Sequence, residues 1–302
     1  MEQPIDIVIP YVNGNDPVWL AKYGLYRPDM RINARFRETY TLKYQLRSIE
    51  KNVPWVNNIY LVLAFESQIP EWLDPHAEKL NIVYHKDFIP NNLLPTFNSG
   101  VIIPFVNRIP GLSNHFIVTN DDMIFSAPNK FYRYFAKHKA VNRVCIIDED
   151  YKLSDNKLFT KIRYNSVRYF NEYVGSGKMI KYADWHLPQS YIKSDWDEVW
   201  QNYGKVLAKT MCGSKFRVSK NINEWMFYYI SAYKGNTINA PIDPKGYMLV
   251  NDRTKAEEIQ NLIDEHHPCI CLNDGIQVKG DIWKSVDEML KGLFPEKSHF
   301  EK

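Results

Sequence analysis

Short apolar runs alternate, through the first half of the chain, with stretches whose apolar residues recur at helical spacing. Runs of strand length cover residues 5–9, 59–65, 80–84, 115–119 and 144–147. Between the first two runs, Leu42, Leu46 and Ile49 predict an amphipathic helix over residues 39–51, and a short helical turn is expected within 70–79. Strands that alternate with helices predict an α/β sheet, and ligands bind such sheets just outside the carboxyl ends of the strands.

The character of the residues divides the chain into three segments. Residues 1–150 carry the strand pattern and form the predicted α/β core, in which a nucleotide would bind. Residues 151–240 are rich in tryptophan and include a helical pattern over 195–210, which predicts a mostly helical insertion. Residues 241–302 return to the core and end in an amphipathic helix over 281–294.

Composition and charge exclude several classes of protein. The 302 residues include 38 Lys+Arg and 35 Asp+Glu, so the formal charge of +3 argues against nucleic acid as a partner. A hydrophobic content of 45% is typical of a globular protein, whereas the aromatic content of 14% suits stacking on sugars or bases as well as core packing. The first residues lack a basic region and no apolar run is long enough for a membrane span, so we expect a cytoplasmic protein.

The sharpest local feature is Asn120-Asp121-Asp122, which directly follows the apolar run 115–119. Adjacent carboxylates must be solvated, paired or bound to a cation. Mg²⁺ or Mn²⁺ fits this position because these ions bind carboxylate oxygens together with phosphates. A helix cap or a solvated turn is the alternative interpretation.

Two further polar segments follow short apolar runs. Asn13, Asn15 and Asp16 follow the first run, where they would suit a ribose or a base edge, although a structural turn explains them as well. Asn273 and Asp274 follow a short apolar run that contains Cys269 and Cys271, so two strand ends could share one cation. Alternatively, Asn-Asp-Gly is a hairpin turn, which is the favoured interpretation without other information.

Arginine, histidine and cysteine side chains are further candidates for functional groups. Arg37 and Arg47 lie at the start and on the face of the first predicted helix, where they could bind a diphosphate or simply face solvent. His186 precedes Leu-Pro and is a candidate general base, although a lone histidine is more often structural. Cys269 and Cys271 have the spacing of half a zinc site, but the sequence lacks a matching pair of ligands, which favours buried thiols.

Four blocks of the sequence resemble the Stealth family of sugar-phosphate transferases, which includes bacterial capsule enzymes and the animal lysosomal-enzyme N-acetylglucosamine-phosphotransferase. The first block is Ile5 to Pro17, which contains Val-Asn-Gly-Asn-Asp-Pro, and the second runs from Arg35-Phe36-Arg37 through Leu94-Pro95-Thr96-Phe97-Asn98-Ser99 to Asn120-Asp121-Asp122. The third block is His186-Leu187-Pro188 followed by Phe216-Arg217, and the fourth is Cys271-Leu272-Asn273-Asp274. The family usually has acidic residues in the stretch that 38–41 occupy, and Thr41 stands here in place of a Glu.

The resemblance implies a Rossmann-like sheet of the nucleotide-diphospho-sugar transferase (GT-A-like) type with a mostly helical insertion. It further implies transfer of a hexose- or N-acetylhexosamine-1-phosphate from a UDP-sugar to a hydroxyl of an oligosaccharide or lipid-linked glycan, with release of UMP, in the synthesis of a cell-surface polysaccharide. An enzyme with such an acceptor would act at the inner face of the bacterial membrane, and lysines near the carboxyl terminus would permit peripheral contact with anionic lipid.

The resemblance also implies a role for each candidate residue. His186 would be the general base on the acceptor hydroxyl, Arg217 would steady the phosphoryl oxygens, and Asp121 would position substrate or metal-bound water. Asp122, Asn273 and Asp274 would hold Mg²⁺ or Mn²⁺. The nucleotide-sugar would contact Asn13, Asn15, Asp16, Arg37 and Arg47.

Two other functions remain open at this point. A metal-dependent glycosyltransferase with the same carboxylates would release UDP instead of UMP. A carbohydrate-binding protein would use its aromatic surplus without a metal, and the carboxylates at the strand ends argue against it.

Overall fold

The computed structural model describes residues 3–29, 36–146, 158–174, 182–184, 186–241, 244–275 and 282–302. Its central feature is a five-stranded sheet in which four strands are parallel and the last is antiparallel. In spatial order the strands are β3 (Leu80–Tyr84), β2 (Ile59–Leu63), β1 (Ile5–Pro10), β4 (His115–Val118) and β9 (Gln189–Ile192). The parallel strands confirm the predicted α/β, Rossmann-like sheet.

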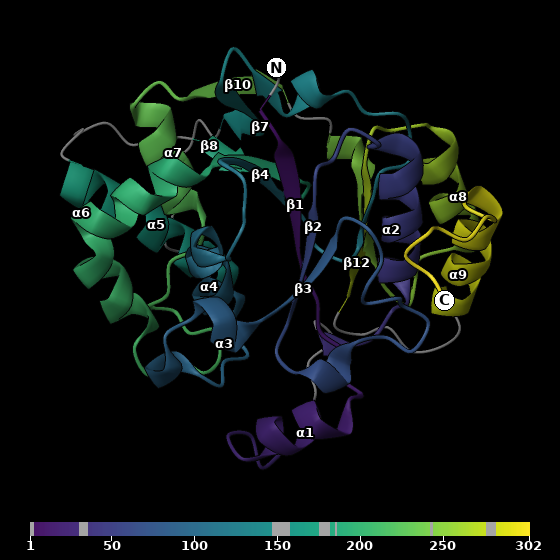
Figure 1. The fold of residues 1–302 in the computed structure, drawn as a ribbon, viewed down its shortest axis with the longest axis horizontal. Helices are drawn as coiled ribbons and strands as arrows, with labels where there is room; N and C mark the ends of the chain where they lie inside the picture. Colours follow the sequence, from purple (N-terminus) through teal and green to yellow (C-terminus); the bar gives the residue numbers. More distant parts are fainter. Residues whose placement is uncertain are drawn as a thin grey trace.

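Helices cover both faces of this sheet (Figure 1). On one side lie α3 (His85–Phe88), α4 (Ser99–Ile102), α5 (Leu158–Val174), α6 (Lys193–Met211) and α7 (Trp225–Tyr233). On the other side lie α2 (Thr41–Asn52), α8 (Ala256–Asp264) and α9 (Ile282–Leu293). A further helix, α1 (Pro17–Gly24), lies beyond the carboxyl end of β1.

The alternation of side chains along β1 explains why both faces need cover. Ile5, Ile7 and Ile9 pack with Leu42 and the rest of the α2 face, whereas Val8 packs in the other core. Five of the six residues of β1 are buried, as expected for a parallel strand between two helical layers.

The remaining strands form two smaller sheets. One has the order β10 (Thr237–Pro241), β7 (Lys139–Ile146) and β6 (Phe135–Ala136), with β8 (Tyr182–Asp184) also paired to β7. The other has the order β11 (Tyr247–Val250), β12 (Ile270–Asp274) and β5 (Met123–Ile124). Because β5 starts directly after Asp122, this third sheet brings the carboxyl-terminal part of the chain to the end of β4.

Most predicted elements are confirmed, including the first helix, which spans Thr41–Asn52, and the terminal helix, which spans Ile282–Leu293. Residues 70–79 form turns instead of the expected helix, and the strand expected at 144–147 is the end of β7, outside the central sheet. The predicted boundary at 150 lies outside the described residues. Asn273-Asp274-Gly275 is not a hairpin turn, because β12 pairs with β11 and β5, which both precede it in the chain.

The described part of the segment 151–240 contains α5, α6 and α7, and it also supplies a strand of the central sheet. The strand β9 pairs antiparallel to β4, with Ser190 opposite Ile117. Its sequence, Gln-Ser-Tyr-Ile, lacks an apolar run, so sequence periodicity does not reveal it. The backbone amide of Ser190 donates to Asn142 Oδ1 at 3.0 Å, which adds to the pairing of β9 with β4.

Candidate active site

The carboxylate pair predicted from the sequence lies in a tight connection between β4 and β5. The backbone amide of Thr119 donates to the Val8 carbonyl at 3.1 Å, which continues the pairing of β4 with β1. From α2, the side-chain Nε2 of Gln45 donates to Thr119 Oγ1 at 3.2 Å and to the Asn120 carbonyl at 2.6 Å. These bonds hold the connection at the carboxyl end of the sheet, where α/β proteins bind ligands.

Strand β12 places its polar end beside this connection. The Leu272 amide donates to the Asp122 carbonyl at 3.0 Å, and Cys271 lies opposite Met123 in the pairing of β12 with β5. Asn273 donates through Nδ2 to the Tyr247 hydroxyl at 2.9 Å. The ends of β4 and β12, which are far apart in the sequence, therefore meet at one site, as predicted for a shared cation.

His186 lies on the solvent side of the same cluster. Its Nε2 atom is 2.9 Å from Asn120 Nδ2 and 3.7 Å from Asp122 Oδ2, and its side chain is 41% exposed. The Tyr247 ring meets the imidazole edge to face, with ring centroids 6.2 Å apart. Because an amide nitrogen only donates, Nε2 accepts in this contact, and a substrate hydroxyl would have to replace Asn120 before Nε2 could take its proton.

Arg37 supplies a positive charge to this cluster. Its Nη1 atom is 3.1 Å from Asp274 Oδ1. Burial and the nearby charge of Asp122 raise the pKa of Asp274, and the charge of Arg37 partly offsets them. The Arg37 side chain is 34% exposed, so its guanidinium is accessible to a phosphate.

The donor set of this cluster fits a hard divalent cation. Among the described residues, Asp122 Oδ1 and Asp274 Oδ2 are buried side-chain oxygens without a hydrogen-bond partner. Unpaired buried carboxylate oxygens are costly unless a cation balances them. Asp122 and Asp274, with the amide oxygen of Asn273, would hold Mg²⁺ or Mn²⁺.

Two acidic or phenolic residues that the sequence analysis did not assign complete the cluster. Tyr11, just beyond β1, donates through its hydroxyl to Glu38. Burial and the Glu38 carboxylate raise the pKa of Tyr11, and burial raises the pKa of Glu38. Burial, followed by the charges of Asp122 and Glu38, raises the pKa of Asp121 well above its usual range. The sequence feature that pointed to this pair was the acidic stretch that the family pattern has around Glu38.

We expect that Asp121→Asn increases thermal stability at neutral pH. A carboxyl group whose pKa is raised in the folded state destabilises that state once the pH exceeds its unfolded pKa, near about 4. In a chelator, the melting temperature of the variant should exceed that of the wild type by a few degrees at pH 7 and converge with it as the pH falls to about 4. Equal melting temperatures at both pH values would contradict the burial of this charge.

The loop predicted to line a nucleotide is held in shape largely by hydrogen bonds that its own side chains make. Asn13 Oδ1 accepts from the Asn15 amide at 2.9 Å, and Asp16 caps α1 by accepting from the Trp19 amide at 2.9 Å. The Gly14 amide donates to the Phe36 carbonyl at 2.8 Å, and a Cβ at Gly14 would lie only 2.2 Å from that oxygen. The loop therefore needs glycine for its close approach to the residue before Arg37. Asn15 is exposed, whereas Asp16 is buried in its capping role.

Arg217 is positioned by a network around Ser99. Its Nε atom donates to Ser99 Oγ at 3.0 Å. The buried Asn98 side chain donates to the Phe216 carbonyl at 3.1 Å and to Asn221 Oδ1 at 3.0 Å. These bonds tie residues 214–218 to the segment at the start of α4.

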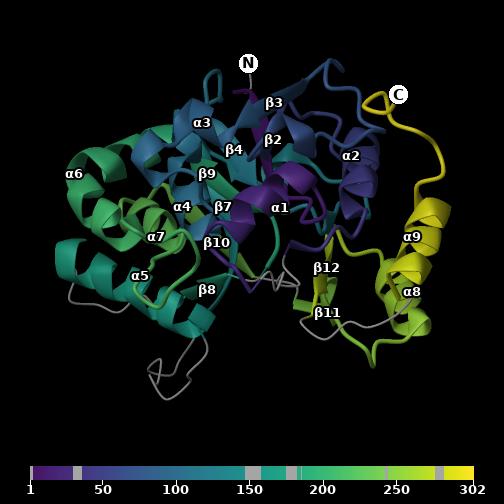
Figure 2. The same cartoon turned by 90° about the horizontal axis from the view of Figure 1, so that it is seen from below.

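An aromatic cluster joins the Arg37 and Arg217 segments beneath α1. Tyr23 of α1 lies 5.8 Å from Phe36 and 5.4 Å from Phe216, measured between ring centroids. Phe36 and Phe216 directly precede the two arginines. In the view onto the carboxyl edge of the sheet, α1 lies between α4 and β12 (Figure 2). Part of the aromatic surplus thus fixes the backbone of predicted phosphate-binding residues.

The structure corrects the prediction for Arg47, whose side chain is in the core. Its guanidinium binds Glu301 through Nε and Nη2 at 2.6 and 2.7 Å, and its Nη1 donates to the Phe294 carbonyl at 2.6 Å. The side chains of Arg47 and Glu301 are 7% and 2% exposed. Arg47 therefore anchors the carboxyl terminus to α2, which leaves it unsuited to bind a nucleotide.

We expect that Arg47→Ala lowers the free energy of unfolding by about 3 kcal/mol or more, because it leaves the Glu301 carboxylate buried without its partner. Burial disfavours ionisation of Glu301, but hydrogen bonds from Arg47 and Ser298 outweigh it and lower its pKa. The contribution of the pair is thus present at pH 7 and lost as the pH falls below about 4.

Urea unfolding measures this effect, and Lys43→Ala is the matched control. Lys43 Nζ lies 3.9 Å from the same carboxylate and is 32% exposed, so its loss should cost less than about 1 kcal/mol. A stable Arg47→Ala protein with impaired nucleotide binding would instead restore the role predicted from the sequence.

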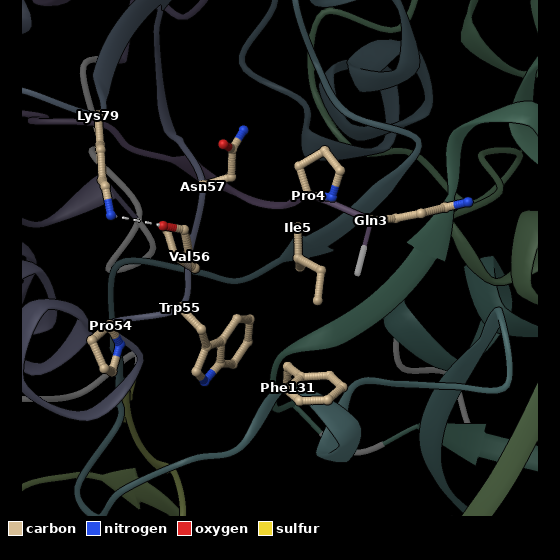
Figure 3. A pocket seen from close by; sticks show the side chains of 9 residues that line it. All are labelled: Gln3, Pro4, Ile5, Pro54, Trp55, Val56, Asn57, Lys79 and Phe131. Atoms are coloured by element: carbon tan, nitrogen blue, oxygen red, sulfur yellow. Dashed lines mark hydrogen bonds between the residues drawn. The ribbon is translucent and has the colours of Figure 1, made fainter. Parts of the chain in front are cut away.

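A pocket of about 320 Å³ lies at the opposite, amino end of the sheet. Figure 3 shows Trp55 and Phe131 beside Ile5, at the start of β1, with Lys79 donating to the Val56 carbonyl at 3.2 Å. None of the described residues that line it carries a carboxylate. This pocket is thus unsuited to the metal and phosphate chemistry of the cluster at the carboxyl end.

Comparisons with known proteins identify relatives along the whole chain. Residues 35–143 match the family model for Stealth protein CR2, conserved region 2. The chain is 33% identical to a receptor polysaccharide phosphotransferase, WefC, of Streptococcus gordonii, with 100% of both proteins covered. It is 31% identical to a capsular polysaccharide phosphotransferase, WcwK, of Streptococcus pneumoniae, again with 100% of both covered. Among solved structures, the galactosyltransferase LgtC aligns with 97% of this chain and 96% of its own, with 9% identity and a TM-score of 0.47.

Proposed function

The chain belongs to the Stealth family, and we propose that it transfers a hexose- or N-acetylhexosamine-1-phosphate from a UDP-sugar to a hydroxyl of an acceptor glycan. The product would be a phosphodiester in a cell-surface polysaccharide, and the released nucleotide would be UMP. The names of the relatives support phosphotransfer into polysaccharide, and the UDP-sugar donor is what the resemblance to the Stealth family implies.

The observation that carries the proposal is the position of His186 beside the carboxylate cluster. Its Nε2 atom lies 3.7 Å from Asp122 Oδ2, within reach of a hydroxyl group that approaches the same site. In the proposed reaction the acceptor oxygen attacks the phosphorus nearest the sugar, and its proton passes to His186 Nε2. The phosphoanhydride bond breaks, UMP leaves with the bonding electrons, and the anomeric carbon keeps its configuration.

The other charged residues of the site would bind the phosphates, the cation and the substrate. Arg37 and Arg217 would bind phosphoryl oxygens through their guanidinium groups, which match phosphate geometry. The divalent cation, when bound at Asp122, Asn273 and Asp274, supplies compensation for the charge of the diphosphate. Asp121, with its raised pKa, would position substrate or water through a hydrogen bond.

Where the enzyme acts follows from its acceptor. Among the described residues, no helix combines the length and apolar character needed to span a bilayer. We propose a cytoplasmic enzyme that meets an oligosaccharide or lipid-linked glycan at the inner face of the membrane.

The identity of the nucleotide product tests this function. Purified protein is incubated with UDP-sugars, Mg²⁺ or Mn²⁺, and an acceptor glycan, and the released nucleotide is separated as UMP or UDP. UMP that depends on the acceptor supports phosphotransfer, whereas UDP would identify a glycosyltransferase. An Asp122→Asn preparation exposes a contaminating pyrophosphatase, because UMP from a contaminant persists in it.

A further inference from the structure

We propose that Asp122, His186 and Cys271 form a second, thiophilic metal site, which binds Zn²⁺ and thereby blocks phosphotransfer. The inhibitory consequence rests on the proposed function, whereas the metal site itself rests on the geometry of the three side chains. The sequence pattern favoured a buried Cys271, and the thiol is fully buried. Burial and the charge of Asp122 raise the pKa of Cys271 well above its usual range, so a metal ion that binds this thiol must displace its proton.

The three side chains converge from separate elements. One ligand atom of each lies within 4.8 Å of those of the other two, and His186 Nε2 is 3.7 Å from Asp122 Oδ2. Cys271 is fully buried, Asp122 is partly buried and His186 is exposed, so the group runs from the core to solvent. Pairing of β5 with β12 fixes the backbone of Asp122 and Cys271.

The ligand types determine which cation the group prefers. A thiolate, an imidazole and a carboxylate form a nitrogen- and sulfur-containing set that suits Zn²⁺, whereas Mg²⁺ prefers oxygen ligands. Three protein ligands leave the fourth position of a tetrahedral ion open to water. On binding, Cys271 Sγ exchanges its proton for a bond to the metal, and the proton passes to water.

Two donor sets therefore overlap at Asp122. The oxygen set extends toward Asp274, and the nitrogen and sulfur set extends toward His186 and Cys271. A Zn²⁺ ion in the second set occupies the lone pair of the proposed general base and one carboxylate of the hard-cation site. Thiophilic metals should consequently inhibit the enzyme even when Mg²⁺ is abundant.

Cobalt binding tests the site without any substrate. Co²⁺ is added to the metal-free full chain, and thiolate ligation is read from the near-ultraviolet charge-transfer band. The wild type should give this band, Zn²⁺ should remove it, and Cys271→Ser should lack it. Absence of the band in the wild type would overturn the proposal.

The chain offers two matched controls. Cys269 lies two residues from Cys271 and is buried in the same apolar cluster, and Cys212 is an exposed thiol at the end of α6. Cys269→Ser and Cys212→Ser should keep the band, and a band that depends on Cys269 instead of Cys271 would contradict the assignment. If circular dichroism shows that Cys271→Ser is misfolded, His186→Gln must weaken cobalt binding at least about tenfold, because it removes an exposed ligand.

Inhibition is measured as the Zn²⁺ concentration that halves UMP release in excess Mg²⁺, relative to the uninhibited rate of each protein. Cys271→Ser should raise this concentration at least about tenfold. An unchanged value would show that Zn²⁺ acts elsewhere and would overturn the inhibitory role. If the protein releases no UMP with any donor, the proposed function fails, while the cobalt spectrum still decides the metal site.

Discussion

His186→Ala should lower kcat by about 10²- to 10⁴-fold, the usual contribution of a general base. His186 Nε2, 3.7 Å from Asp122 Oδ2, is the group that would accept the proton of the attacking hydroxyl at this position. The side chain is 41% exposed and forms no part of the core clusters, so its removal should leave the fold intact. Steady-state rates of UMP release measure the effect, and the melting temperature serves as the check on folding.

Two comparisons distinguish loss of the base from indirect effects. His76→Ala, at an exposed histidine in a turn before β3, should keep full activity. Asn120→Ala removes the bond that orients the imidazole and should lower kcat less than His186→Ala does. If His186→Ala retained more than about a tenth of the wild-type kcat, another group would have to be the base.

The parts of the site that were predictable are those that follow from strand order. Asp121 and Asp122 follow one apolar strand, and Asn273 and Asp274 end another, so their meeting at a sheet edge required only that the two strands lie close together. The resemblance to the Stealth family added the order of the blocks. Periodicity alone could not show that β12 pairs with β5, because β5 contains only Met123 and Ile124.

Other features depend on contacts that sequence patterns do not encode. Tyr11 and Glu38 are 27 residues apart in the sequence, and the hydroxyl of one donates to the carboxylate of the other just beyond β1. Arg47 lies on the polar side of an amphipathic pattern, yet its guanidinium is buried because it binds Glu301, which is 254 residues away in the sequence. A basic residue on a predicted helix face thus identifies a charge but not its partner. The same limit applies to β9, which tertiary pairing forms from a largely polar sequence.

The second large effect is expected for Asp122→Asn, which preserves shape but removes the charge that both donor sets share. Charge stabilisation by a bound cation contributes several kcal/mol to the transition state, so kcat should fall by at least about 10³-fold. The substitution also removes a negative charge that raises the pKa of the neighbouring Asp121 and Asp274 carboxyl groups. The variant should therefore be at least as stable as the wild type in a chelator.

Metal-dependent stabilisation separates loss of the cation from loss of the fold. A cation at 100 times its dissociation constant stabilises the folded wild type by about 2.7 kcal/mol, so Mg²⁺ or Mn²⁺ should raise its melting temperature. Asp122→Asn should lose most of this increase, whereas Asp264→Asn, at an exposed position of α8, should keep both the increase and the activity. If Asp122→Asn lost activity but kept the full metal-dependent increase, the cation would bind elsewhere. The unpaired oxygens of Asp122 and Asp274 would then need another partner, such as a proton, which the raised pKa of Asp274 favours at that residue.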